Sequence, residues 1–196
     1  MWSGLRGWWI VVALTAALSM HLYAQEQPST DTSGASSSDA VLSRNMLVPL
    51  KVVREFFPAI SRLQGGEENA SAVGNPTATR TAVYTTKDAS KRVVLSVEQY
   101  ASLGDALTAY QEAVKRTQVP ELTPIALSNV GQDVFAGIVT QGGDTHVTIK
   151  TLDGDLLVGA TLSGFDASTD NIAKLANLTR KELAQAKGHE KSRRGG

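Results

Sequence analysis

The chain contains no cysteine, and this absence excludes several kinds of chemistry. Disulfide bonds, thiol nucleophiles, cysteine metal sites and lipid attachment through a lipobox cysteine all require the residue. With 196 residues, the chain has room for one ordinary domain plus appendages and no room for a second catalytic domain. The fold must therefore be stabilised by its hydrophobic core alone.

Tryptophan is confined to the first nine residues, and the chain has no excess of charge of one sign. The three tryptophans are Trp2, Trp8 and Trp9, so the rest of the chain offers no tryptophan platform for sugar rings. Lys and Arg together number 19, and so do Asp and Glu. Nucleic-acid binding depends on a broad positive surface, and we therefore expect no nucleic-acid partner.

Residues 1–24 have the layout of a signal peptide, with a basic start at Arg6, an apolar run and a more polar exit. We favour cleavage after Ala24, because a strongly polar stretch begins immediately after it, with cleavage after Ser19 as the alternative. An uncleaved anchor is the competing interpretation, because Trp8–Ala24 is 17 residues long, at the short edge of what spans a bilayer. Either way, we expect an extracytoplasmic protein that is periplasmic, secreted or anchored in the membrane by this segment.

Residues 25–40 are small, polar and rich in Ser and Thr, which is typical of a disordered linker. They are equally compatible with a tether and with a disordered terminus that has no role. We expect one α+β domain over residues 41–187. Residues 188–196 are predicted to be a basic disordered tail, for which a solvated terminus is favoured over attachment to an anionic surface.

The first predicted helix begins at Pro49, which fits the first turn of a helix. Its apolar positions recur at helical spacing: Leu50, Val53, Phe56 and Phe57. Pro58 ends or kinks the helix, and residues 64–69 are predicted to form a surface loop.

Two runs of β-favouring residues follow, at 79–86 and 92–98, and they are predicted to form a hairpin. Val93, Leu95 and Val97 fall on one face of the second run. A helix is then predicted to start at Ser102, with Asp105 completing an approximate capping box. We expect the stripe of this helix that faces the sheet to be Leu103, Leu107, Tyr110, Val114 and Thr117.

Three further strands are predicted at 133–140, 145–151 and 155–162, joined by turns at 141–144 and 153–154. The last helix is predicted to start between residues 166 and 169 and to stop before Gly188. Its apolar stripe consists of Ile172, Leu175, Leu178 or Thr179, and Leu183. The fold class that follows is α+β: a single antiparallel β-sheet, made of the hairpin and the three-stranded meander, with helices packed on one face.

His146 is the one histidine that falls inside a predicted strand, where it shares the more polar side with Thr148 and Lys150. No serine or carboxylate lies at a recognised motif spacing from it, so we favour a surface histidine without a function over a general base.

Three aspartates lie near the meander turns, namely Asp144, Asp153 and Asp155. They fit turn residues better than a calcium loop. The glycine-containing loops at 129–131 and 141–143 match no nucleotide-binding fingerprint.

Asn69 and Asn177 fit the glycan acceptor pattern, which matters only if the source organism glycosylates exported proteins. Their use is left open. The sequence predicts no catalytic, cofactor-binding or metal-binding residue, and no cofactor.

The chain combines an export signal, a Ser/Thr-rich tether, an entry helix of the form Leu47-Val48-Pro49, and a body of hairpin, helix, meander and helix. The chain resembles the small extracytoplasmic α+β domains of bacterial envelope proteins, including lipoproteins and sensor ectodomains of PsbP or Mog1-like shape. The missing lipobox cysteine departs from the lipoprotein members. The resemblance transfers no site residues.

We therefore expect a non-enzymatic envelope or secreted domain that binds a protein or a small apolar ligand, through the sheet face or a helix–sheet cleft. One alternative is an extracytoplasmic hydrolase or isomerase whose carboxylates meet only in three dimensions. A structural envelope component is another.

Overall fold

The computed structural model describes residues 46–67, 75–117, 119, 121–141 and 143–194. All of these belong to the unit that spans Ser38–Gly196. The predictions for the signal segment, the linker and the Asn69 acceptor site fall outside the described residues.

The described residues form one antiparallel sheet of seven strands in the order β1-β2-β3-β7-β6-β5-β4. Pairing between β3 and β7 joins the hairpin to the meander, so the α+β prediction and its single sheet are confirmed. The strands are β1 (Arg62–Glu67), β2 (Ala78–Thr85), β3 (Arg92–Gln99), β4 (Leu122–Pro124), β5 (Asp133–Gln141), β6 (Asp144–Asp153) and β7 (Leu156–Ser163).

Two of these strands are additional to the predicted hairpin and meander. β1 covers part of the segment 64–69 that was predicted to be a loop, and that prediction was wrong up to Glu67. β1 pairs with β2 through a register shift between Gln64 and Gly66. β4 is a short edge strand that pairs with β5.

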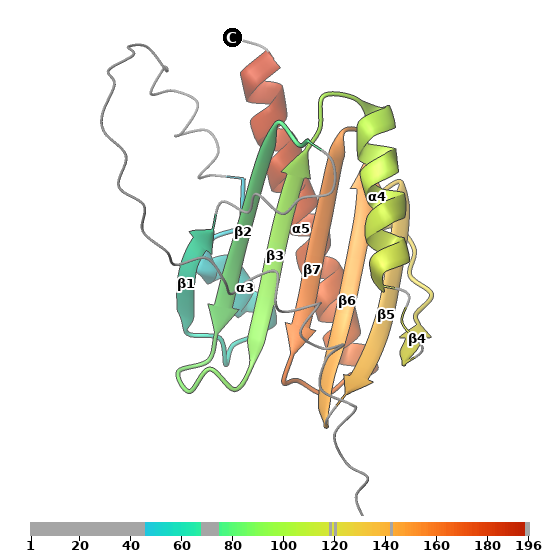
Figure 1. Ribbon diagram of the computed structural model, residues 1–196. Coiled ribbons are helices and arrows are strands. Elements are labelled where there is room, and N and C mark those ends of the chain that lie inside the picture. The colour runs from blue at the N-terminus through green and yellow to red at the C-terminus, as the bar shows by residue number, and fades with distance from the viewer. Residues whose placement is uncertain (1–45, 68–74, 118, 120, 142, 195–196) are drawn as a thin grey trace, which may run out of the picture. The chain divides into compact units, whose positions relative to one another are not determined.

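Three helices flank the sheet: α3 (Leu50–Phe56), α4 (Leu103–Thr117) and α5 (Thr169–Arg194). α3 and α5 lie on one face, called here the α5 face, and α4 lies on the opposite face, called the α4 face (Figure 1). The prediction that all helices pack on one face was therefore wrong. The physical reason is a second apolar cluster, in which α4 packs on Tyr100, Leu152 and Leu157.

The main core fills the space between the sheet and the α3 and α5 helices. The β3 side chains Val93, Leu95 and Val97 are fully buried on this face, as their alternation predicted. α5 contributes Leu175 and Leu178, which are also fully buried. The apolar stripe predicted for the last helix is thus confirmed.

α4 starts with the predicted cap, since the N–H of Asp105 donates to the Ser102 hydroxyl at 3.1 Å. The stripe predicted to face the sheet was wrong for its two leucines, whereas Tyr110 does pack against the cluster between α4 and the sheet. Leu103 and Leu107 are 50% and 39% exposed, and the buried positions are Ala106, Ala109 and Ala113. Small side chains let this helix lie close to the sheet, and the leucines are left on its flank.

α5 does not stop before Gly188 but continues to Arg194. The predicted end of the helix was therefore wrong, and most of the segment 188–196 that was predicted to be a disordered tail is helical. In the part of the chain that the structure describes, no helix is both long enough and apolar enough to span a membrane.

Candidate functional site

β2 and β7 end at the end of the sheet away from α4 (Figure 1). The strand registers place a row of polar residues across the α4 face at this end. Each residue of the row is the direct cross-strand partner of the next one. In order across the sheet, the residues are Arg62, Thr85, Arg92, Ser163 and His146. Directly opposed residues of an antiparallel pair point to the same face. With about 4.8 Å between neighbouring strands, the row is roughly 19 Å long. We call these residues the basic row.

The two arginines of the basic row carry charges that no described residue neutralises. Arg62 and Arg92 are both exposed. Within the described ranges, no salt bridge or side-chain hydrogen bond involves either guanidinium. The row therefore presents two positive charges that are available to a ligand.

Thr85 lies between these arginines on the middle strand. Its side chain is 1% exposed, and its Oγ1 atom has no hydrogen-bond partner among the described residues. A buried hydroxyl without a partner costs free energy, because it has lost its bonds to water. The row thus holds an unsatisfied hydroxyl between its two cations.

His146 forms the other end of the row. Its Nδ1 lies 2.8 Å from the Ser163 hydroxyl oxygen. Burial lowers the pKa of His146, the carboxylate of Asp144 opposes this shift, and the positive charge of Arg92 adds to it. The imidazole is consequently neutral near pH 7 and hydrogen-bonds as a neutral ring.

The serine partner of His146 was missed because no catalytic motif links two residues at this spacing. The signal that could have found it is the turn at residues 153–154, where Gly154 adopts a positive φ of 65°. Counting outwards from a tight hairpin turn fixes the register of both strands. That count places His146 opposite Ser163, as observed.

Further along the α4 face, Lys150 lies half-buried beside a glycine. A Cβ atom on Gly159 would lie 3.8 Å from the Lys150 amine and only 2.5 Å from the Ser96 hydroxyl. Burial lowers the pKa of Lys150, and the nearby carboxylate of Glu98 opposes that shift. The Tyr100 hydroxyl in turn donates to Glu98, so this carboxylate already has a hydrogen-bond partner.

The three turn aspartates are not brought together. Asp144 begins β6 and Asp153 ends it, which separates their backbones by roughly 30 Å at the rise of an extended strand. Asp153 instead forms an ion pair with Lys187 at 2.6 Å. Among the described residues, no cluster of three or more His, Asp or Glu side chains could hold a metal ion.

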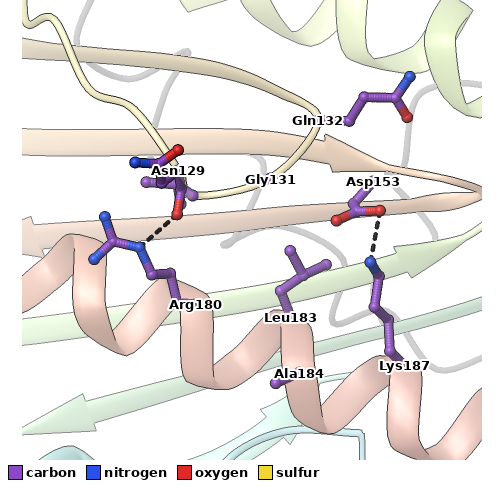
Figure 2. A pocket seen from close by; sticks show the side chains of 9 residues that line it. Asn129, Gly131, Gln132, Asp153, Arg180, Leu183, Ala184 and Lys187 are labelled. Carbon is purple, nitrogen blue, oxygen red and sulfur yellow. Dashed lines mark hydrogen bonds and ion pairs between the residues drawn. The ribbon is translucent and has the colours of Figure 1, made fainter.

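A groove of about 460 Å³ lies between α5 and the loop that precedes β5 (Figure 2). The cations that line it already have partners. Lys187 pairs with Asp153, and the Arg180 Nε donates to the Asn129 carbonyl at 2.6 Å. Arg180 also donates to the Ser128 carbonyl at 3.1 Å. These contacts fasten the loop to α5, which is a structural role.

A buried carboxyl group lies on the α5 face. Glu182 is 0% exposed, and burial raises its pKa to about 8, against the effect of a hydrogen bond from the Val48 N–H. It is therefore largely protonated at neutral pH. Because Glu182 is sealed from solvent, it does not supply the converging carboxylates in a cleft that the hydrolase or isomerase alternative needs.

Comparison with known proteins identifies a structure with a similar fold but does not identify a family. No protein-family model and no curated protein sequence matches the chain. The chain is similar to the crystal structure of the extracellular domain of PknH from Mycobacterium tuberculosis, with a TM-score of 0.53, 10% identity, and coverage of 71% of this chain and 93% of that one.

A GTP binding regulator from Thermotoga maritima matches at a TM-score of 0.38 and 14% identity, over 68% of this chain and 89% of that one. A match at this TM-score carries no argument about the fold. The likeness to PknH shows the fold alone, and it agrees with the resemblance to extracytoplasmic α+β domains at that general level. The chain thus has an α+β fold that is also found in an extracellular domain.

Proposed function

We propose that this chain is an extracytoplasmic, non-enzymatic binding domain that takes its partner on the α4 face, at the basic row. The observation that carries the proposal is the difference between the two faces of the sheet. α3 and α5 bury one face in the main core, whereas α4 packs only near Leu152 and Leu157 on the other. The end of the α4 face that carries the basic row has no described helix over it (Figure 1).

Two further observations support the extracytoplasmic location. The domain shares its fold with the extracellular domain of PknH, and residues 1–24 have the layout of a signal peptide. Charged and amide side chains line the groove beside α5 together with Val130, Leu183 and Ala184, so the groove gives only partial support for a small apolar ligand. A polar partner at the exposed arginines of the α4 face is the better match.

Fractionation combined with site-specific photo-crosslinking in the native host tests this proposal. The full-length chain would carry a photoreactive residue in place of Thr161, which is half-buried on the α4 face two positions before Ser163. The matched control would carry the photoreactive residue at Ala184, which is exposed on α5.

We expect the chain in an extracytoplasmic or membrane fraction, with a specific cross-linked product at Thr161 and none at Ala184. Retention in the cytoplasm would overturn the proposal. Equal products at both positions would also overturn it, because a partner on the α4 face cannot reach the outer side of α5.

A serine-type hydrolase is the second candidate function, and the 2.8 Å contact between His146 and Ser163 is the observation that favours it. Such an enzyme orients its histidine with a third group, and no described carboxylate is hydrogen-bonded to His146. The positive charge of Arg92 also weakens this histidine as a base. Turnover of an ester substrate by the purified chain, lost in His146→Ala, would favour the hydrolase over the binding domain.

A further inference from the structure

We propose that Arg62, Thr85 and Arg92 form a binding site for a phosphate-type oxyanion. This inference rests on the proposed function, because it names the chemistry of the ligand on the same face. The shared chemistry is a tetrahedral oxyanion with several acceptor oxygens. Two sources supply it outside the cytoplasm, free phosphate and the phosphate headgroup of a lipid, and the experiment separates them.

The register of the sheet supplies the geometry. Thr85 is the direct cross-strand partner of Arg62 on one side and of Arg92 on the other. The two arginine backbones are therefore about 10 Å apart, with the threonine midway between them. Long side chains that start at this separation can converge on one anion above the middle strand.

The hydrogen-bonding groups also match an oxyanion. Each guanidinium presents a planar set of N–H donors that fits two oxygens of a phosphate. The Thr85 hydroxyl is the remaining group, and it has no partner among the described residues. A phosphate oxygen above β2 would accept from both arginines and would satisfy this hydroxyl once the exposed arginine side chains move to admit it.

The local charges favour an anion over a cation. Asp88, in the adjoining hairpin loop, is occupied by its own neighbours: hydrogen bonds from Thr86 and Ser90 lower its pKa to about 2. Glu98 lies further along the face and accepts from Tyr100. Neither carboxylate forms a salt bridge with an arginine of the row within the described ranges.

Stability alone gives no reason for this arrangement. Two unpaired positive charges flank one strand, and although salt screens most of their repulsion at exposed positions about 10 Å apart, no described residue offsets what remains. The buried Thr85 hydroxyl adds the cost of an unsatisfied polar group. A bound oxyanion removes both costs at once.

The direct test is a titration of the purified full chain with inorganic phosphate, followed by the amide NMR signals of Thr85 and Arg92. Chloride at equal ionic strength serves as the salt control. We expect saturable shifts at these two amides with phosphate. Arg92→Gln or Thr85→Val should weaken phosphate binding at least about tenfold, because each removes a hydrogen bond to a charged group.

Arg54→Gln is the matched control, since Arg54 is an exposed arginine on α3, outside the basic row. It should leave phosphate binding unchanged. Shifts that do not saturate, or equal weakening by Arg54→Gln and Arg92→Gln, would overturn the site. Thr85→Val conserves the volume of the side chain, and the amide spectrum shows directly whether the variant remains folded.

Co-sedimentation with vesicles identifies the source of the phosphate. Binding to phosphatidylglycerol vesicles and not to phosphatidylcholine vesicles, lost in Arg92→Gln, would assign a lipid headgroup. Saturable binding of inorganic phosphate without vesicle binding would assign a soluble ligand. If phosphate fails to bind while the Thr161 cross-link is retained, the oxyanion site is wrong and the proposed binding function stands.

Discussion

The carboxyl group of Glu182 accepts a hydrogen bond from the backbone N–H of Val48 at 2.9 Å, across 134 positions of the sequence. The Tyr84 hydroxyl donates to the carbonyl of the same residue, so side chains from α5 and β2 bind both backbone polar groups of Val48. The Gln185 amide also donates to the Leu47 carbonyl at 2.6 Å. The segment that leads into α3 is therefore fixed to the α5 face by side chains.

This buried carboxyl makes stability depend on pH. Burial raises the pKa of Glu182 from 4.5 to about 8, so the folded state holds a proton that the unfolded state releases above about pH 4.5. The stabilisation is complete below the unfolded pKa and is lost as pH rises towards the folded pKa. The chain should lose a few kcal/mol of unfolding free energy between pH 5 and pH 8 from this group.

Glu182→Gln should remove this pH dependence. The glutamine oxygen can still accept from the Val48 N–H, and the amide never ionises, so the variant should exceed the wild type in stability at pH 8. Urea unfolding at pH 5 and pH 8 measures the effect. Glu55→Gln is the control, because Glu55 forms only an exposed pair with Lys181 at 3.1 Å. An unchanged pH slope in Glu182→Gln would contradict the prediction.

Tyr84→Phe should destabilise the fold by about 1–2 kcal/mol, because it leaves the buried carbonyl of Val48 without its donor. Tyr110→Phe should change stability much less, since the Tyr110 hydroxyl makes no hydrogen bond to the described residues. Chemical unfolding of both variants measures the difference. Equal losses would show that ring packing, rather than the bond to Val48, dominates at Tyr84.

The alanine stripe of α4 predicts losses of different size at two nearby residues of the helix. Ala109 is 2% exposed against the sheet, whereas Leu107 is 39% exposed. Ala109→Leu should overpack this contact and cost about 1–3 kcal/mol. Leu107→Ala should cost less, about 1 kcal/mol, because Leu107 lies on the solvent-facing flank of the helix and its truncation does not disturb the close contact with the sheet. Thermal unfolding of the two variants provides the comparison, and a larger loss in Leu107→Ala would reverse our assignment of the buried stripe.

Gly159→Ala should be destabilising, because its Cβ would approach the Ser96 hydroxyl oxygen to 2.5 Å. The expected loss is about 1–2 kcal/mol. The double variant Gly159→Ala with Ser96→Ala removes the atom that clashes and should recover most of the loss. Unfolding midpoints of the single and double variants test the coupling. A double variant no more stable than Gly159→Ala would show that the backbone, not the Ser96 hydroxyl, resists the change.

The strands that could be predicted are those in which apolar and polar residues alternate, because only one face of the strand is buried. Val93, Leu95 and Val97 alternate with polar residues, and the α5 face buries all three. β1 could not be predicted because its segment contains Gly65 and Gly66 and has no such alternation. Its strand conformation depends on the hydrogen bonds that β2 offers to it.

The buried face of α4 could not be predicted from the sequence for a different reason. Its leucines and alanines form adjacent stripes, and hydropathy alone favours burial of the larger side chains. The sheet beneath the helix already carries Leu152 and Leu157, so the close contact selects the small residues Ala106 and Ala109. The basic row was missed for a related reason, because it depends on the order in which separate strands pair.

The pairing of β3 with β7 also sets the order in which this chain can complete its fold during synthesis. The β2–β3 hairpin is finished long before residues 156–163 have been made. Until then, β3 is an open edge whose Val93, Leu95 and Val97 have no cover from α5. Such an edge is a template for pairing between unfinished chains. A chaperone that shields the nascent chain until β7 and α5 emerge would therefore act at the step where this fold is most prone to aggregate.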